Sequence, residues 1–347
     1  MLYQIAIATA FVLISTLSSN AAVIEYSSYD DVFDGRGEIT LSGSVEVGDR
    51  EKLVSAVEAI WSETSRSSDI TIILDSQGGS YHEAILIARY IAETWVRTRV
   101  RSGSECFSAC AIIFLSGSYN TESGKGIITS RTVEVGAKLG FHAPFIQIGG
   151  NGRYTSDTVE EAFSAGVQAV LALSEISEIA QIDGSLLNEI IKVGSDDFFL
   201  IETVDHFGRW QIDIDNNFSA IEPSTINHLL NLCINAFAWQ ANTLIYSYPG
   251  LLKFPYSTSS SELKEYFQTS WGGDFEGSHD NGNPRKYVLS NPVFGGDATT
   301  CIVNGYSEDS YQVHFTGDFS GFPWRADAYT TRVSIPSWAI QNPDENW

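Results

Sequence analysis

Residues 69–80 read DITIILDSQGGS, and this stretch decides the fold. The run ITIIL, set between two aspartates, is rich in β-branched and aliphatic side chains, which is typical of a parallel strand buried on both faces. The pair Gly78–Gly79 ends this strand, and residues 81–96 then have the apolar spacing of a helix. The stretch therefore predicts a buried strand, a glycine turn and a helix, which together begin a βαβ unit.

The same alternation of strand and helix patterns continues on both sides of this stretch. We expect strands at 38–43 and 98–101, and helices at 49–64 and 158–193, the latter with a break near Asp183–Gly184. Strands that alternate with helices in this way predict right-handed βαβ units and a parallel sheet. Residues 25–37 are polar and are expected to form an irregular lead-in.

The residue composition of the sequence changes at about residue 216. A helix is expected at 224–238, followed by sequence rich in Gly, Ser, Asn and aromatic residues. Short alternating runs at 300–306 and 311–315 predict antiparallel strands. The chain therefore divides into three parts, which are a signal peptide (1–21), an α/β domain (37–215) and a smaller β-rich C-terminal region (216–347) whose role the sequence does not indicate.

Charge and hydropathy limit the partners and the location. The chain of 347 residues has 43 acidic and 20 basic side chains, and its net charge of −23 repels phosphate backbones, so nucleic-acid binding is not expected. An apolar run over residues 5–17, followed by Ser19-Asn20-Ala21, predicts a cleaved secretory signal, with an uncleaved anchor or a buried helix as alternatives. No later run reaches the length of a membrane span, so an exported protein, periplasmic or secreted, is expected.

Export makes disulfides the first interpretation of the four cysteines, which can pair in three ways. Cys106 and Cys110 come within disulfide reach if the chain turns into a helix there. That pairing leaves Cys233 to join Cys301. The C-x-x-x-C spacing is neither the usual redox motif nor a paired zinc motif, so neither a metal nor a cofactor is expected.

Three pieces of sequence at the expected ends of parallel strands could carry chemistry. Gly78–Gly79 can expose backbone N–H groups, as an oxyanion hole requires; Ser108 begins a helix if 109–115 is helical; and His142 lies in GFHAP. Each also has a plainer interpretation, which is a turn glycine, a helix N-cap and a structural histidine. Because serine is a weak nucleophile until a base takes its proton, catalysis requires that Ser108 and His142 meet in space.

Taken in order, the segments LDSQGGS, SECFSACAIIFLSG and GFHAP resemble the Clp protease proteolytic-subunit superfamily. The resemblance covers about residues 37–215 and is closest to exported bacterial ClpP-like proteins that have a Cys-x-Ser-Ala-Cys segment. It implies a ClpP/crotonase-like spiral of βαβ units with a parallel sheet. It also implies a serine peptidase that acts on a peptide or protein substrate without a cofactor, and it is compatible with a homo-oligomer.

The family roles can be carried over to matching residues. Ser108 would be the nucleophile and His142 the general base, and the N–H groups of Gly79 and Ala109 would bind the oxyanion. The segment SDDFFLIETVDHFGRWQID resembles the part of the family that contains the orienting aspartate. Asp196 fits that role best, and Asp197 is the fallback.

The chain also departs from the family. Gln77 stands where proline is common, which predicts a looser glycine loop, and cysteines surround Ser108, where a disulfide would either fix or distort the turn. The alternative is therefore a catalytically silent ClpP-like binding or scaffold protein whose C-terminal region recognises a partner. A crotonase-type acyl-CoA enzyme is a third hypothesis, which export disfavours.

Overall fold

The structure is a computed structural model of the 347-residue chain. It describes residues 21–30, 35–64, 69–121, 126–145 and 154–215 of the N-terminal part, together with 228–229, 231–233, 235–236, 239, 275–278, 286–291, 299–307, 310–316, 331–341 and 346. The expected signal peptide lies almost entirely outside these residues.

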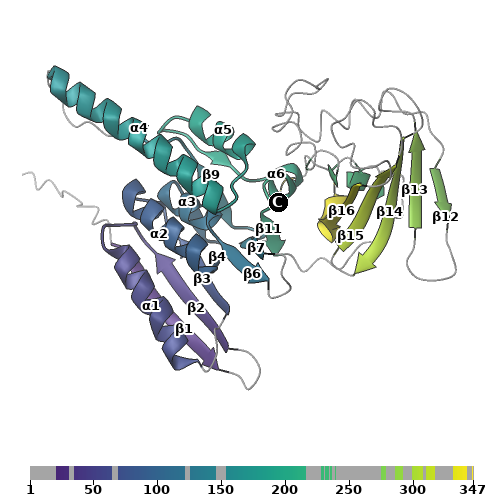
Figure 1. The fold of residues 1–347 in the computed structure, drawn as a ribbon, viewed down its shortest axis with the longest axis horizontal. Helices are drawn as coiled ribbons and strands as arrows, with labels where there is room; N and C mark the ends of the chain where they lie inside the picture. Colours follow the sequence, from purple (N-terminus) through teal and green to yellow (C-terminus); the bar gives the residue numbers. More distant parts are fainter. Residues whose placement is uncertain are drawn as a thin grey trace, which may run out of the picture.

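A six-stranded sheet forms the centre of the α/β part (Figure 1). In spatial order its strands are β1 (Val23–Asp30), β2 (Gly35–Ser42), β3 (Asp69–Asp75), β4 (Arg97–Val100), β8 (Arg131–Glu134) and β11 (Asp213–Asp215). All neighbouring pairs are parallel except β1 with β2. Strand β3 is the apolar run at 69–75, and Ile72 and Leu74 within it are completely buried, as predicted for a central parallel strand.

Helices alternate with these strands. They are α1 (Asp49–Glu63), α2 (Tyr81–Thr94), α3 (Ala109–Leu115), α4 (Ser156–Ile179), α5 (Gly184–Lys192) and α6 (Val204–Arg209). The break predicted near Asp183–Gly184 is confirmed, because the Asp183 carboxylate accepts a hydrogen bond from the Ser185 N–H (2.7 Å) and caps α5. All seven residues of α3 are buried, so this short helix lies inside the core.

The irregular lead-in expected at 25–37 is wrong, because β1 and the start of β2 occupy it. β1 is the edge strand, and its backbone pairs antiparallel with β2 along its whole length. Its polar side chains are suited to an edge, since several face solvent and two, Tyr26 and Ser28, donate hydrogen bonds to the Glu63 carboxylate at the end of α1 (3.0 and 2.7 Å). A polar composition is therefore compatible with a strand at this position.

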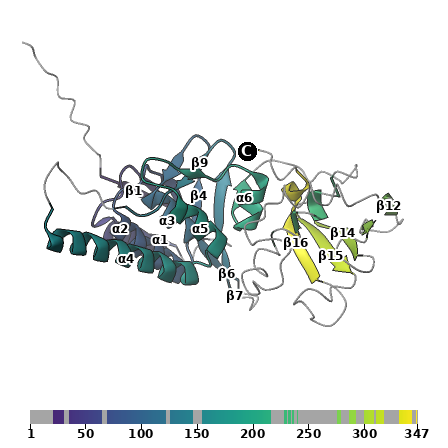
Figure 2. The same cartoon turned by 90° about the horizontal axis from the view of Figure 1, so that it is seen from above.

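Helix α4 extends beyond the body of the molecule (Figure 2). By length and composition it could cross a membrane, and only 11% of its most apolar 18-residue stretch is buried. Its exposed large hydrophobic side chains are Val159, Phe163, Val167, Val170, Leu171 and Ile179. Its C-terminal half packs on α2, where the Tyr81 hydroxyl donates to the Ala169 carbonyl (2.7 Å) and Arg89 pairs with Glu175 (2.9 Å). The expected absence of a membrane span therefore stays a prediction.

The C-terminal region is a separate antiparallel sheet at the other end of the molecule (Figure 1). Its strands are β12 (Phe275–Ser278), β13 (Lys286–Asn291), β14 (Thr299–Ser307), β15 (Ser310–Thr316) and β16 (Thr331–Pro336), followed by the 3₁₀ helix η2 (Ser337–Ile340). Each strand pairs with the next, as the alternating runs predicted. The predicted fold class, α/β with a mostly parallel sheet and a smaller β-rich region, is confirmed.

Two small units complete the α/β part and bear on the site. The strands β5 (Glu105–Phe107), β9 (Lys138–Phe141) and β10 (Phe199–Leu200) form a three-stranded sheet in the order β10-β9-β5. The strands β6 (Ser118–Thr121) and β7 (Gly126–Thr129) form a hairpin. Because β5 and β9 run parallel, the residues that follow them emerge at the same edge.

Candidate active site

The glycine turn, Ser108 and His142 lie side by side at this edge. Phe107, the last residue of β5, is paired with Gly140 of β9, so Ser108 and His142 follow neighbouring strands. On the other side of β5, Ser76 bridges to Cys106 in parallel, and the Ser76 carbonyl accepts a hydrogen bond from the Phe107 N–H (3.0 Å). The three segments singled out in the sequence thus form one row, with Ser108 in the middle.

Ser108 has an unusual backbone conformation. Its φ of 55° and ψ of −121° place it in a region that residues with a side chain rarely adopt, at a cost of about 1–3 kcal/mol. Its N–H donates to the Gly140 carbonyl (3.0 Å), and its own carbonyl accepts from Ala111 (3.0 Å) as α3 begins. The side chain does not cap the helix, so the N-cap interpretation of the hydroxyl is wrong, and Oγ forms no hydrogen bond with a described residue.

The glycine turn lies directly against Ser108. A Cβ atom on Gly78 (φ 103°) would lie 2.7 Å from the Ser108 Cβ, and one on Gly79 (φ 145°) would lie 2.2 Å from the Val45 carbonyl oxygen. Glycine is therefore required at both positions by space and by backbone conformation. In the described part of the chain, neither the Gly79 N–H nor the Ala109 N–H at the start of α3 has an acceptor, so both are available as oxyanion donors.

The looser loop expected from Gln77 stays a prediction, but its side chain has a partner in β5. The Gln77 side-chain amide donates a hydrogen bond to the Glu105 carboxylate, whose other oxygen accepts one from Lys138 Nζ (2.6 Å). Glu105 thereby links the glycine turn, β5 and β9, the segments that lead to Gly79, Ser108 and His142. The Lys138 hydrogen bond and, second, the Gln77 hydrogen bond lower the pKa of Glu105 below its ordinary value.

This network predicts a pH dependence of stability. Because the pKa of Glu105 is lowered in the folded protein, its stabilising effect is present above the ordinary value of about 4.5 and is lost as pH falls through the lowered pKa. The melting temperature of the wild type should therefore fall by about 1–3 °C more than that of Glu105→Gln between about pH 6 and pH 3, a small shift because the network is exposed. Melting curves over this range measure the difference, and parallel pH profiles would contradict it.

His142 lies next to two phenylalanine side chains. Its Nδ1 is 2.7 Å from the Ala143 carbonyl oxygen, so Nδ1 is the donor and Nε2 is left as the basic nitrogen. The Phe198 ring stacks on Phe107 (4.8 Å between centroids) and lies 5.4 Å from the His142 ring, and Phe145 lies 5.3 Å from it on another side. No hydrogen bond joins His142 to Ser108 or to a described carboxylate.

Asp196 lies in the loop beside His142, but its carboxylate does not reach the ring. The loop 194–198 is anchored at both ends next to His142, since the Val193 carbonyl accepts from the Ala143 N–H (3.0 Å) and Phe199 pairs with Phe141. The Asp196 side chain is exposed and accepts a hydrogen bond from the Ser195 hydroxyl (3.1 Å). Asp197 is exposed as well, so the Ala143 carbonyl holds Nδ1 where an aspartate was expected.

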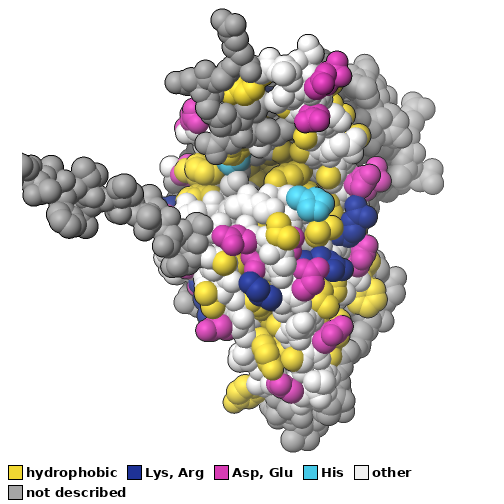
Figure 3. Space-filling view, turned by 90° about the vertical axis from the view of Figure 1, so that its left-hand side faces the viewer, with side chains coloured by type: hydrophobic (Ala, Val, Ile, Leu, Met, Phe, Trp, Pro, Cys, Tyr) yellow, Lys and Arg dark blue, Asp and Glu magenta, His cyan; other side chains and the backbone are white. Residues whose placement is uncertain are grey.

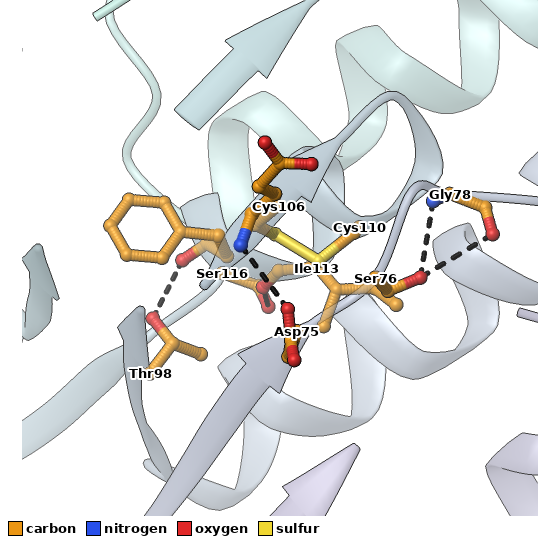
Figure 4. Close-up of a disulfide and its surroundings, with 10 residues drawn as sticks. Asp75, Ser76, Gly78, Thr98, Cys106, Cys110, Ile113 and Ser116 are labelled. Carbon is orange, nitrogen blue, oxygen red and sulfur yellow. Dashed lines mark hydrogen bonds between the residues drawn. A yellow bond between two sulfur atoms is a disulfide. The ribbon is translucent and has the colours of Figure 1, made fainter. Parts of the chain in front are cut away.

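The disulfide predicted between Cys106 and Cys110 is present, with the two Cα atoms 5.2 Å apart (Figure 4). Cys233 is also disulfide-bonded, and the side chain of its expected partner Cys301 lies outside the described residues. Among the side chains that the structure describes, no group of three or more His, Cys, Asp or Glu is placed to hold a metal ion.

One cavity in the described part of the chain lies next to the glycine turn, and another lies away from the site. The first, of about 480 Å³, is lined by Gly43, Ser44 and residues 75–79. The other, of about 370 Å³, lies between the α/β part and the C-terminal region, next to Trp210, Trp239 and Trp338, and contains none of the predicted site residues. Among the described residues, Gly79 is the only predicted site residue that lines the first cavity.

Sequence reasoning missed the hydrogen bonds that join Gln77, Glu105 and Lys138 on one side of the site, and the contact of Phe198 with His142 on the other. Gln77 stood out only as a departure from the family, and Phe198 stood out only by following Asp196 and Asp197 in the segment that resembles the family. On the face in Figure 3, histidine and hydrophobic side chains reach the surface among acidic ones, and few basic ones are visible. The surface thus agrees with the strongly acidic composition.

No protein-family model matches the chain, and no curated protein matches it. A solved structure that is similar is that of a point mutant of ClpP1 from Listeria monocytogenes, with 15% sequence identity and a TM-score of 0.36. The match covers 52% of this chain and 92% of that chain. It concerns the fold alone, and the chemistry has to be judged from the residues of this chain.

Proposed function

We propose that this protein is an exported serine peptidase that hydrolyses peptide bonds through an acyl-enzyme on Ser108. The observation that carries the proposal is the turn at Ser108, which lies against the glycine turn and next to the strand that leads to His142. Among the described residues, the Ser108 hydroxyl and the N–H groups of Gly79 and Ala109 have no hydrogen-bond partner. A strained strand-to-helix turn of this kind keeps a nucleophile exposed at the start of a helix.

The proposed reaction uses these groups in turn. His142 Nε2 takes the proton of the Ser108 hydroxyl as Oγ attacks the carbonyl carbon of the substrate, and the carbonyl π electrons move to its oxygen. The N–H groups of Gly79 and Ala109 stabilise the resulting oxyanion. When the intermediate collapses, His142 gives the proton to the leaving amine, and a water molecule activated by the same nitrogen then hydrolyses the acyl-enzyme.

The proposal requires a movement at His142, because Ser108 and His142 are not hydrogen-bonded in the structure. Catalytic hydrogen bonds are often long in substrate-free structures and shorten when substrate binds. The Phe198 ring lies between Phe107 and His142, and its half-exposed position in the loop 194–198 gives it room to move. Displacement of this ring by a substrate side chain would let the imidazole approach Ser108.

The cavity beside the glycine turn, which Gly79 lines but Ser108 and His142 do not, offers room for part of a peptide next to one proposed oxyanion donor. Its volume of about 480 Å³ is within the range of ligand sites, and backbone groups and small side chains make up most of its lining. The disulfide at Cys106–Cys110 and the bonded Cys233 support export, since disulfides persist in oxidising compartments.

Labelling with a fluorophosphonate probe tests the proposal, since the probe reacts with activated serines. The wild type is expected to be labelled and Ser108→Ala is expected to lose all labelling, while Ser104→Ala, four residues earlier in the chain, should be labelled like the wild type. If Ser108→Ala keeps the label, or if neither the folded wild type nor a Phe198→Ala variant takes it, Ser108 is not an activated nucleophile.

A catalytically silent binding protein is the second candidate. The position of Phe198 against His142 and the exposed carboxylates of Asp196 and Asp197 favour it, because they leave the histidine without an acidic partner. This candidate predicts that neither the wild type nor a Phe198→Ala variant is labelled by the probe. Labelling of Phe198→Ala alone would instead indicate a peptidase whose site is closed by this ring.

A further inference from the structure

The disulfide spans the turn that holds Ser108. Cys106 is the middle residue of β5, Cys110 lies in the first turn of α3, and Ser108 is midway between them in the sequence. Figure 4 shows the bond crossing from the strand to the helix, with Ser76 and Gly78 of the glycine turn beside it. The bond therefore fixes how far the start of the helix lies from the end of the strand.

The conformation of Ser108 requires such a restraint. A non-glycine residue at a φ of 55° persists only where the surrounding structure imposes it. The hydrogen bonds of the turn run from the Ser108 N–H to Gly140 and from Ala111 and Ile112 to the Ser108 carbonyl. They hold the peptide units on both sides of Ser108, and the disulfide is the covalent link across the same turn.

The effect of this disulfide is expected to be local. A disulfide restricts the unfolded chain least when the loop it closes is short, and here the sequence separation is only four. Both cysteine side chains are completely buried, at 0% exposure, so dissolved thiols do not reach the bond in the folded protein. The bond is therefore placed to act as a permanent restraint on the turn rather than as a redox switch.

We propose that Cys106 and Cys110 are positioning residues, whose disulfide holds Ser108 in the strained turn and its hydroxyl beside the N–H groups of Gly79 and Ala109. The restraint on the backbone is a property of the fold. Its consequence for a nucleophile rests on the proposed peptidase function, so the two are tested separately.

Melting temperatures of four full-length proteins test the restraint. They are the wild type, Ser108→Gly, the pair Cys106→Ala/Cys110→Ala, and the variant that combines all three substitutions. Glycine adopts a positive φ without strain, so Ser108→Gly should raise the melting temperature of the disulfide-bonded protein by about 1–3 °C. Without the disulfide the turn can relax, and the same substitution should raise the melting temperature by less than about 1 °C.

Equal shifts in the two backgrounds would overturn the proposal, because Ser108 would then be equally strained with and without the bond. If the alanine pair does not fold, Cys106→Val/Cys110→Ala takes its place, since valine restores buried volume and suits the strand position. The same four-protein comparison then decides the question.

The rate of fluorophosphonate labelling tests the consequence for the nucleophile. The maximal labelling rate of Cys106→Ala/Cys110→Ala should fall at least about tenfold. The probe concentration at half-maximal rate should change less than about twofold, since a displaced nucleophile slows the reaction rather than binding. An unchanged maximal rate would overturn the positioning role. If neither the wild type nor Phe198→Ala is labelled, the proposed function fails, and the melting temperatures alone decide whether the disulfide restrains the turn.

Discussion

Replacing His142 with alanine is expected to lower the rates of fluorophosphonate labelling and of peptide hydrolysis by about 10²–10⁴-fold, the usual contribution of a general base. The reason is the position of His142 after β9, beside the turn of Ser108, with the Ala143 carbonyl holding Nδ1 and leaving Nε2 to take the serine proton. No other histidine follows β5 or β9 directly. The loss should therefore fall on the maximal rate of the reaction rather than on probe binding.

Asp196→Asn and Asp197→Asn are the matched controls for this prediction. Both carboxylates are exposed and neither contacts the imidazole, so each substitution is expected to change the labelling rate less than about tenfold. A loss comparable to that of His142→Ala in one of them would show that the loop 194–198 rearranges and that this aspartate replaces the Ala143 carbonyl. Labelling of His142→Ala at the wild-type rate would exclude His142 as the base.

The parts of the site that the sequence predicted are those set by local pattern. The buried strand at 69–75, the turn Gly78–Gly79 and the helix start at Ser108 each follow from residue type and spacing over a few positions. Parallel strands end at a common edge, so the meeting of the glycine turn with Ser108 and His142 followed from the order of elements. The Cys106–Cys110 bond was predictable for the same local reason.

The parts that could not be predicted depend on which way side chains point. Whether Asp196 faces His142 or solvent is decided by the contacts of an exposed loop, and no pattern in the sequence encodes that choice. The hydrogen bond between Gln77 and Glu105 joins residues on different segments, and no local sequence pattern predicts it. Strand β1 was missed because an edge strand does not need the apolar alternation by which buried strands are recognised.

Arg131→Met is expected to cost about 3–5 kcal/mol of the free energy of unfolding, the largest stability effect we predict. The Arg131 side chain in β8 is 1% exposed and donates hydrogen bonds to the carbonyls of Leu115 (2.8 Å), Gln211 (3.2 Å) and Gln181 (3.4 Å). Burial lowers the pKa of Arg131 to about 10, which leaves the guanidinium charged at neutral pH.

Methionine fills a similar volume but leaves the buried Leu115 carbonyl and the partly buried carbonyls of Gln211 and Gln181 without this donor. An unsatisfied buried group costs about 1–3 kcal/mol. Urea unfolding followed by tryptophan fluorescence measures the change. Arg99→Met in the neighbouring strand β4 is the control, because Arg99 is about a third exposed and its pairs with Glu134 and Asp215 are worth less than about 1 kcal/mol. A similar cost for both variants would contradict the role of the Arg131 hydrogen bonds.

The same residue connects stability to the site. Leu115 is the last residue of α3, the helix that begins directly after Ser108, so Arg131 anchors the far end of the helix whose first N–H is a proposed oxyanion donor. Arg131→Met is therefore expected to lose labelling at Ser108 at a lower urea concentration than Arg99→Met, in parallel with its unfolding. Loss of labelling well below the unfolding midpoint would mean instead that α3 shifts within the folded protein, and that the hydrogen bond to Leu115 positions the site as well as stabilising the fold.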